Sequence, residues 1–259
     1  MHKRIGWGLI MLTLCCALAA AVAAEEVTEE TLVSPLEGYT PMSMPGEWYY
    51  AVDYDTLLGA EKNRYIELVN QDHLLDSRYK PKDLVNIRVR KTSYDPIQMR
   101  KEASEALTTL FEDAASQGIT LYALSGYRSY STQRTMYYNR LEAHNGVDDK
   151  AVAYPGASDH QTGLGADVIN KGSIDAKLST RFVGTKEALW LGAHSWEYGF
   201  VVRYPEDKKD ITGIIYEPWH LRYVGLDVAA YIANNNLCLE EFTVEWEAEK
   251  AAYEGAPQG

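Results

Sequence analysis

The amino-acid sequence predicts an α+β domain with a mainly antiparallel sheet flanked by helices. Helix-like and short strand-like segments follow one another irregularly, and no run of regular βαβ units is visible, which favours an α+β over an α/β fold. The 259 residues are 46% hydrophobic and 24% charged, an ordinary composition for a globular protein that argues against disorder. This length permits one sizeable domain without requiring a second.

The clearest elements are a helix and a strand in the middle of the chain. Apolar residues recur at spacings of three and four within residues 99–117, which predicts an amphipathic helix. These positions are Met99, Ala103, Ala106, Leu107, Leu110, Phe111 and Ala114. Gly118 is a natural helix stop, and the apolar run that follows predicts a strand at residues 119–124.

Shorter patterns predict the remaining elements. Ser131 can cap a helix that runs to about His144, where an Asn-Gly pair ends it. The other predicted segments are a strand at residues 165–169, a helix at 186–198 closed by Gly199, strands at 200–204 and 214–217, and a final helix at 224–234.

The chain is predicted to have four parts. Residues 1–24 combine a basic start, an apolar run and an Ala-rich end, which is typical of a secretory signal peptide. An uncleaved membrane anchor is the alternative, because the run approaches the roughly 20 residues that span a bilayer. Residues 25–60 are interpreted as a linker or wrapping arm, 61–238 as the folded domain, and 239–259 as an acidic tail that is either a docked helix or a solvated end.

These features predict an exported protein, either extracellular, in the cell wall or periplasmic. Any membrane attachment is expected only through the N-terminal segment. The net charge of -12 repels phosphate backbones, so nucleic acid is not an expected partner. Once residues 1–24 are removed, Cys238 is the single remaining cysteine, and no internal disulfide can form.

Two histidine-containing stretches, residues 158–167 and 216–220, have the composition of a metal site. Zinc favours imidazole and carboxylate ligands, and a catalytic site typically uses three protein ligands and keeps one position for water. His160, Asp167 and His220 would supply two neutral ligands and one anion. The competing interpretation is that each histidine is an ordinary hydrogen-bonded structural residue, because the patterns H-x6-D and E-x2-H are short.

Glu217 lies three residues before His220, where a carboxylate could exchange protons beside a metal site. The stretch is not an H-E-x-x-H helix, because no histidine precedes the glutamate and Pro218 fits poorly inside a helix. A regular strand would place Glu217 and His220 on opposite faces. The chain must therefore bend near Pro218 if both side chains face one metal ion.

A third stretch, residues 125–133, follows the predicted strand at 119–124. Gly126 permits a turn, and the fork of donors on Arg128 could hold an oxyanion or a carboxylate. Taken alone, this stretch is more typical of a surface turn with a solvated arginine.

Together, the three stretches resemble the VanY-type D-alanyl-D-alanine carboxypeptidases, zinc peptidases grouped with lysostaphin-type enzymes and hedgehog-like domains. The matching motifs are S-G-Y-R-S-Y-x-x-Q at residues 125–133, S-x-H-Q-T-G-L at 158–164 followed by Asp167, and E-P-W-H-x-R-Y-V-G at 217–225. Shorter matches lie at residues 68–70, 79–81, 198–200, 203–205 and 211–213. The resemblance covers roughly residues 66–231 and implies a single hedgehog-like D-Ala-D-Ala peptidase domain.

The resemblance also implies a role for each matched residue. His160, Asp167 and His220 become the ligands of Zn²⁺. Glu217 becomes the general base and acid, and Arg128 the group that polarises the scissile carbonyl. The expected substrate-contacting residues are Ser125, Gln133 and Ser158, with Trp219 shaping the pocket wall.

The activity implied is removal of the terminal D-alanine from peptidoglycan peptide stems, which would be the partner of the protein. An L,D-carboxypeptidase acting on tetrapeptide stems is the closest alternative, because similar motifs serve both cuts. A catalytically silent cell-wall-binding module is the alternative from another class. The presence of all four expected groups, the three ligands and Glu217, argues against it.

Overall fold

A computed structural model describes residues 54–174 and 181–255 of the chain. The predicted signal segment and most of the predicted arm at residues 25–60 lie outside the described residues, so export remains a prediction. Among the helices of the described part, none is long and apolar enough to cross a membrane.

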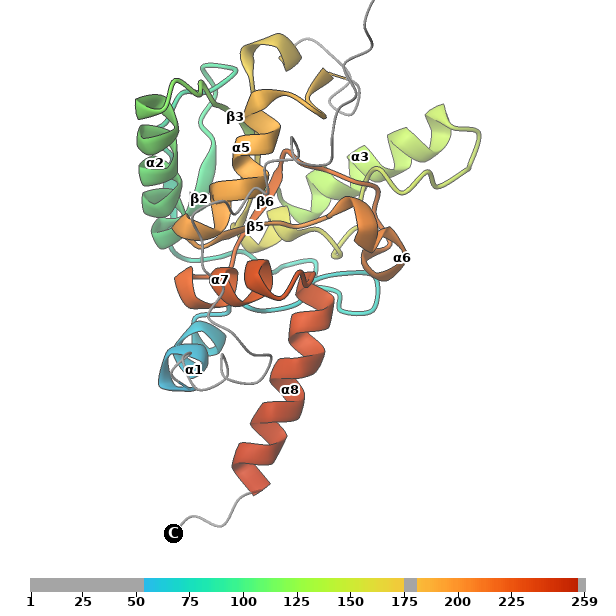
Figure 1. Cartoon of the computed structure of the whole chain (residues 1–259). Helices are drawn as coiled ribbons and strands as arrows, with labels where there is room; N and C mark the ends of the chain where they lie inside the picture. The colour runs from blue at the N-terminus through green and yellow to red at the C-terminus, as the bar shows by residue number, and fades with distance from the viewer. Residues whose placement is uncertain (1–53, 175–180, 256–259) are drawn as a thin grey trace, which may run out of the picture. The chain divides into compact units, whose positions relative to one another are not determined.

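The main sheet has four antiparallel strands in the order β3-β4-β6-β5. These strands are β3 (Tyr122–Ser125), β4 (Gly165–Ile169), β5 (Phe200–Val202) and β6 (His220–Tyr223). A separate antiparallel pair is formed by β1 (Leu84–Asn86) and β2 (Gln98–Arg100). The mainly antiparallel sheet and the helices around it confirm the predicted α+β class (Figure 1).

The predicted strand at residues 214–217 is wrong, and the fourth strand of the main sheet is β6 instead. Within this segment Ile215 donates its backbone N–H to Lys150 O at 3.1 Å, whereas Glu217 donates to Tyr204 O at 3.1 Å. The backbone hydrogen bonds of this segment therefore go to two separate parts of the chain, at Lys150 and at Tyr204. A strand needs a continuous ladder of hydrogen bonds with one neighbouring strand, which this segment does not have.

The helices follow the sequence patterns with small differences at their ends. The α-helices are α1 (Tyr54–Lys62), α2 (Lys101–Ser116), α3 (Tyr130–Ala143), α5 (Lys186–His194), α6 (Lys209–Thr212), α7 (Leu226–Asn234) and α8 (Leu239–Gly255). Short 3₁₀ turns are η3 (Asp159–Thr162), η4 (Lys171–Ser173), η5 (Ser195–Tyr198) and η6 (Glu206–Lys208).

Capping explains two of these differences. Ser129, rather than the predicted Ser131, caps α3, because its hydroxyl accepts the backbone N–H of Thr132 at 3.2 Å. The predicted helix at residues 186–198 divides into α5 and η5, and Gly199 ends the second part with a φ of 80°, in the left-handed region.

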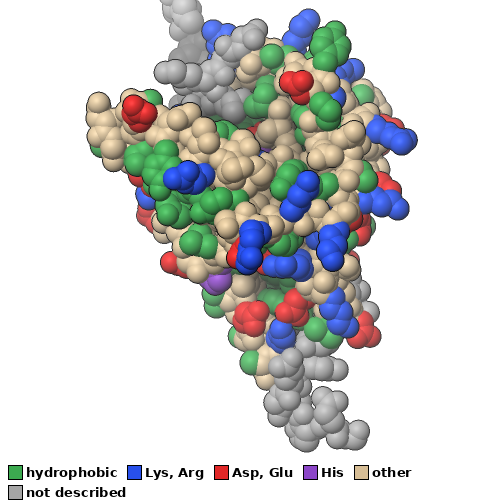
Figure 2. Space-filling model, turned by 180° about the vertical axis from the view of Figure 1, so that it is seen from behind, with side chains coloured by type: hydrophobic (Ala, Val, Ile, Leu, Met, Phe, Trp, Pro, Cys, Tyr) green, Lys and Arg blue, Asp and Glu red, His purple; other side chains and the backbone are tan. Residues whose placement is uncertain are grey.

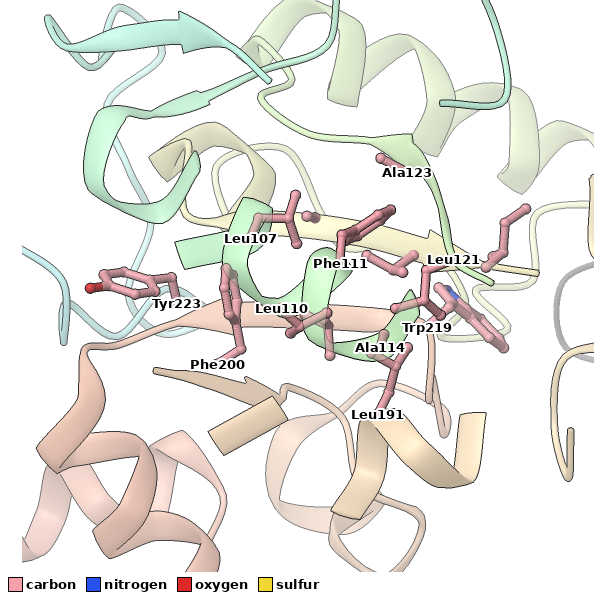
Figure 3. Packing of buried hydrophobic residues seen from close by; sticks show 14 of the residues in the cluster. Leu107, Leu110, Phe111, Ala114, Leu121, Ala123, Leu191, Phe200, Trp219 and Tyr223 are labelled. Carbon is pink, nitrogen blue, oxygen red and sulfur yellow. The ribbon is translucent and has the colours of Figure 1, made fainter. Parts of the chain in front are cut away.

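The main core lies between α2 and the four-stranded sheet (Figure 3). Leu107 and Leu110 of α2 are fully buried, as the spacing of apolar residues predicted. They belong to one cluster with Leu121 before β3, Phe200 of β5 and Leu221 of β6. Truncating either α2 leucine to alanine would cost about 2–5 kcal/mol, because the sheet cannot close over the cavity left behind. This core holds the sheet that carries two of the predicted ligands, Asp167 and His220.

A second core cluster joins the two ends of the described chain. It includes Leu57 of α1, Val228 of α7, and Phe242 and Trp246 of α8 (Figure 1). Phe242 and Trp246 are 4% and 3% exposed. The sequence allowed two interpretations of the acidic C-terminal segment, a docked helix or a solvated end. The structure shows a docked helix over residues 239–255.

Candidate metal centre

Two of the three predicted ligands lie opposite each other in the main sheet. Asp167 of β4 and His220 of β6 are direct cross-strand partners. Directly opposite residues in an antiparallel pair point to the same face with Cβ atoms about 5 Å apart. The third ligand, His160, lies in η3, and Gly163 ends that turn with a φ of 72° before the chain enters β4. The fold thus brings together residues that are 53 positions apart.

The three side chains have the spacing of ligands around one ion. His160 Nε2 lies 3.4 Å from Asp167 Oδ2, and His220 Nδ1 lies 3.1 Å from Asp167 Oδ1. One ligand atom from each residue falls within 4.8 Å of the others, and all three residues are buried. Zinc bonds of about 2 Å in a tetrahedron separate neighbouring ligand atoms by roughly 3.3 Å. The donor set and its spacing fit Zn²⁺.

Hydrogen bonds behind the ligands fix their orientation. His160 Nδ1 lies 2.8 Å from the carbonyl oxygen of Gly126, which can only accept, so Nδ1 carries the proton and Nε2 keeps its lone pair toward Asp167. The Ser125 hydroxyl donates to Asp167 Oδ2 at 2.5 Å. Such outer contacts orient metal ligands and raise their affinity for the ion. Sequence reasoning could not find the Gly126 contact, because a backbone carbonyl leaves no residue-type signal.

Burial and the mutual charges of the three ligands shift the pKa of each one. Burial raises the pKa of Asp167, but His160 and His220 outweigh burial and hold this pKa well below its ordinary value. Burial, together with the charge of Arg128, lowers the pKa of His160. Burial also acts to lower the pKa of His220, yet the hydrogen bond and charge of Asp167 leave this pKa raised. A cation and a proton therefore compete for His220.

Glu217 reaches the same site because the chain turns before β6. The backbone N–H of His220 donates to Glu217 O at 3.0 Å, closing a turn through Pro218 and Trp219. As a result Glu217 Oε2 lies 3.9 Å from His220 Nδ1, and the bend predicted near Pro218 is confirmed. Burial is the largest influence on Glu217 and raises the pKa of its carboxyl to about 8.

A cavity of about 420 Å³ opens over the three ligands and Glu217. Four further predicted residues also line it, namely Arg128, Gln133, Ser158 and Trp219. The guanidinium of Arg128 donates to Gln133 Oε1 at 2.8 Å and lies 3.9 Å from Asp167. Ser125 stands apart from this group, since its hydroxyl contacts Asp167 rather than the cavity. A volume of this size suits the end of a peptide.

The VanY family, described as D-alanyl-D-alanine carboxypeptidase, matches residues 96–226, which is half of the chain. This chain belongs to the VanY family of metal-dependent carboxypeptidases. All of the predicted ligands, together with Glu217 and Arg128, fall within the matched residues.

Known proteins resemble this VanY-family chain in sequence and in structure. YodJ of Bacillus subtilis (strain 168) is 43% identical over 181 residues, which are 68% of this chain and 66% of YodJ, just under two thirds. The solved LD-carboxypeptidase LdcB is 40% identical with a TM-score of 0.65, covering 70% of this chain and 86% of LdcB. A variant of the vancomycin resistance D,D-pentapeptidase VanY, solved with Zn(II), is 30% identical with a TM-score of 0.56. The match covers 69% of this chain and 98% of the VanY variant.

The cavity of this VanY-family chain also contains residues that sequence reasoning missed. Arg140 of α3 lines the cavity and is held by Asp149, with Nε 2.9 Å from Asp149 Oδ1. Tyr204 packs its ring against His220, with ring centroids 5.1 Å apart. The Arg-Tyr-Pro match at residues 203–205 was a signal for Tyr204. Arg140 had no comparable signal, because its position depends on a loop that returns to α3.

Proposed function

We propose that this chain is a zinc-dependent carboxypeptidase that removes the terminal D-alanine from peptidoglycan peptide stems, with the D-alanyl-D-alanine bond of pentapeptide stems as its target. The observation that carries the proposal is the convergence of His160, Asp167, His220 and Glu217 on one cavity. The zinc-bound VanY relative supports the choice of metal. Export to the wall, which rests on the N-terminal sequence, is part of the same proposal.

The chain's own residues account for the proposed hydrolysis. His160, Asp167 and His220 would hold Zn²⁺, which as a Lewis acid supplies positive charge at the scissile carbonyl and lowers the pKa of water. Glu217 lines the cavity beside His220, where its carboxylate is placed to take a proton from water and return it to the departing amine. The Arg128 guanidinium lies on the cavity wall, where it can stabilise the negative charge that develops on the carbonyl oxygen.

One observation favours a second candidate, an L,D-carboxypeptidase that acts on tetrapeptide stems. The LdcB structure has a higher identity and TM-score with this chain than the VanY structure has. Both cuts release D-alanine from a peptide end, so the same metal centre serves either one. The two candidates differ in the residue that must fit on the amino side of the cut.

The experiment is to incubate purified protein with pentapeptide and with tetrapeptide stems and to determine the masses of the products by mass spectrometry. Loss of one alanine from the pentapeptide supports the first candidate, whereas loss from the tetrapeptide alone replaces it with the second. The Glu217→Ala variant should bind zinc and cut neither stem. A wild-type protein that binds zinc and stems but cuts neither would be a silent wall-binding module.

A further inference from the structure

Four charged side chains form a buried network beside the metal centre. Asp159, Arg203 and Arg222 are each at most 1% exposed, and Glu240 is 8% exposed. Asp159 Oδ2 accepts a hydrogen bond from Arg203 Nε at 2.8 Å, and Asp159 Oδ1 accepts one from Arg222. Two positive and two negative charges therefore balance inside the protein, where an unpaired charge is strongly disfavoured.

Two members of the network belong to the segments that carry the ligands, and a third is hydrogen-bonded to one of these segments. Asp159 directly precedes His160 in η3. Arg222 lies two residues after His220 on β6, and the backbone N–H of Arg203 donates to His220 O at 3.0 Å. Both arginines are therefore anchored on backbone that borders His220, and both donate to the residue before His160.

The fourth member comes from the C-terminal helix. Glu240, in the first turn of α8, accepts two hydrogen bonds from Arg203, with Nη1–Oε2 at 2.8 Å and Nη2–Oε1 at 2.6 Å. Asn70 donates a further hydrogen bond to Glu240 Oε1 at 3.3 Å. This bidentate contact leaves the Nε edge of Arg203 directed at Asp159.

We propose that Glu240 is a positioning residue of the metal centre, which acts through Arg203 and Asp159 to hold His160 in its binding geometry. The inference rests on the proposed function, because it takes the His160, Asp167 and His220 group to be the zinc site. Without the Glu240 carboxylate, Arg203 keeps Asp159 as its one carboxylate partner. The orientation of its guanidinium toward Asp159 is then no longer fixed by the bidentate contact on the opposite edge. The buried network also gains an uncompensated positive charge, which opposes binding of a cation close by.

The test compares Glu240→Gln with Glu247→Gln, an exposed glutamate on the same helix. Zinc affinity is measured by competition with a chromophoric chelator, and the visible spectrum of the Co²⁺-loaded protein reports ligand geometry. We expect Glu240→Gln to weaken zinc binding by up to about 10-fold and to change the Co²⁺ spectrum, because groups that contact a ligand directly have effects of about 10- to 100-fold and Glu240 acts through Arg203 and Asp159. Glu247→Gln should match the wild type in both measurements.

A Glu240→Gln variant with a lower melting temperature but wild-type zinc affinity and Co²⁺ spectrum overturns the inference, since Glu240 would then serve the fold alone. Glu240→Asp keeps the charge but is one methylene shorter, so it loses the bidentate contact with Arg203 and should recover only part of the zinc affinity. If Glu240→Gln does not fold, Glu240→Asp replaces it, and wild-type zinc affinity and Co²⁺ spectrum in that shortened variant overturn the inference. If wild-type protein binds no zinc, the proposed function fails as well, so the two failures are distinguishable.

Discussion

The buried carboxyl of Glu217 links stability to pH at the scale of one residue. Its pKa of about 8 in the folded, metal-free protein lies above the ordinary value of 4.5. The folded state therefore holds this proton more tightly than the unfolded chain does. The resulting stabilisation is fully present below pH 4.5 and is lost as the pH rises through about 8.

Replacing Glu217 with glutamine should remove this pH dependence. Relative to the variant, metal-free wild-type protein should lose stability between pH 5 and pH 9, by at most about 4–5 kcal/mol. Urea unfolding of both proteins across this range measures the difference. The exposed Glu249→Gln substitution on α8 is the control and should leave the wild-type profile unchanged. Parallel profiles for wild type and Glu217→Gln would contradict the assigned burial of this charge.

Arg128 allows a second test at the residue scale. Arg128→Lys keeps a positive charge but loses the planar fork that contacts Gln133. We expect kcat to fall by about 10²- to 10³-fold, with zinc stoichiometry unchanged, because the donor aimed at the carbonyl oxygen is lost. Steady-state kinetics and metal analysis measure the two quantities. The control is Arg134→Lys, since Arg134 lies over the ring of Tyr138 outside the cavity; equal losses in both variants would refute the role of Arg128.

At the scale of elements, the metal centre depends on strand register and on one turn. Asp167 and His220 meet because β4 and β6 pair them directly. A slip of one residue would turn one of the two side chains to the other face of the sheet. His160 depends instead on η3, whose end at Gly163 has a left-handed conformation that only glycine adopts without strain.

Gly163→Ala should disturb this turn through both strain and contact. A Cβ atom at residue 163 would lie 2.9 Å from Leu84 Cδ2 and 3.1 Å from Arg100 Cγ. Gly213 has the same φ of 72° but no atom within 4 Å of its Cβ position, so Gly213→Ala isolates the backbone strain of about 1–2 kcal/mol. Thermal unfolding should show a larger loss for Gly163→Ala, and zinc affinity should fall in that variant alone. Identical losses would mean that the close contacts have no effect.

At the scale of the whole molecule, zinc should stabilise the fold, because it binds the assembled site of the folded state and not the unfolded chain. Cys238 is a free, buried thiol. Zinc at a thousandfold excess over its Kd should add about 4 kcal/mol, which for a domain of this size raises Tm by roughly 8 °C or more. Calorimetry before and after chelation measures this effect.

His160→Ala should abolish this rise in Tm with zinc, whereas His194→Ala, outside the ligand group, should retain it. A rise in Tm that survives in His160→Ala would point to another zinc site.

The charge of the molecule is uneven on this scale. The chain carries a net charge of -12, yet Figure 2 shows a face where Lys and Arg side chains gather near its middle. Net charge alone therefore does not describe every surface of the protein. The absence of a nucleic-acid partner remains a prediction from that net charge.

The sequence by itself determined the local features of this protein. The 3.6-residue spacing of apolar side chains predicted α2, and glycines that favour a left-handed φ marked the ends of helices. Short motifs in a fixed order along the chain predicted His160, Asp167 and His220 as metal ligands and Glu217 as the general base. Such signals are readable because helix periods, turn residues and short motifs depend on neighbours within a few positions.

Only the tertiary structure decided which distant residues meet. It paired Asp167 with His220, turned the Ser125 hydroxyl toward Asp167, and replaced a predicted strand at residues 214–217 with β6. It also docked the acidic C-terminal helix and placed Glu240 on Arg203. These contacts join segments separated by tens to more than a hundred residues, and their partners are selected by packing and by the pairing of buried charges, which no local pattern records.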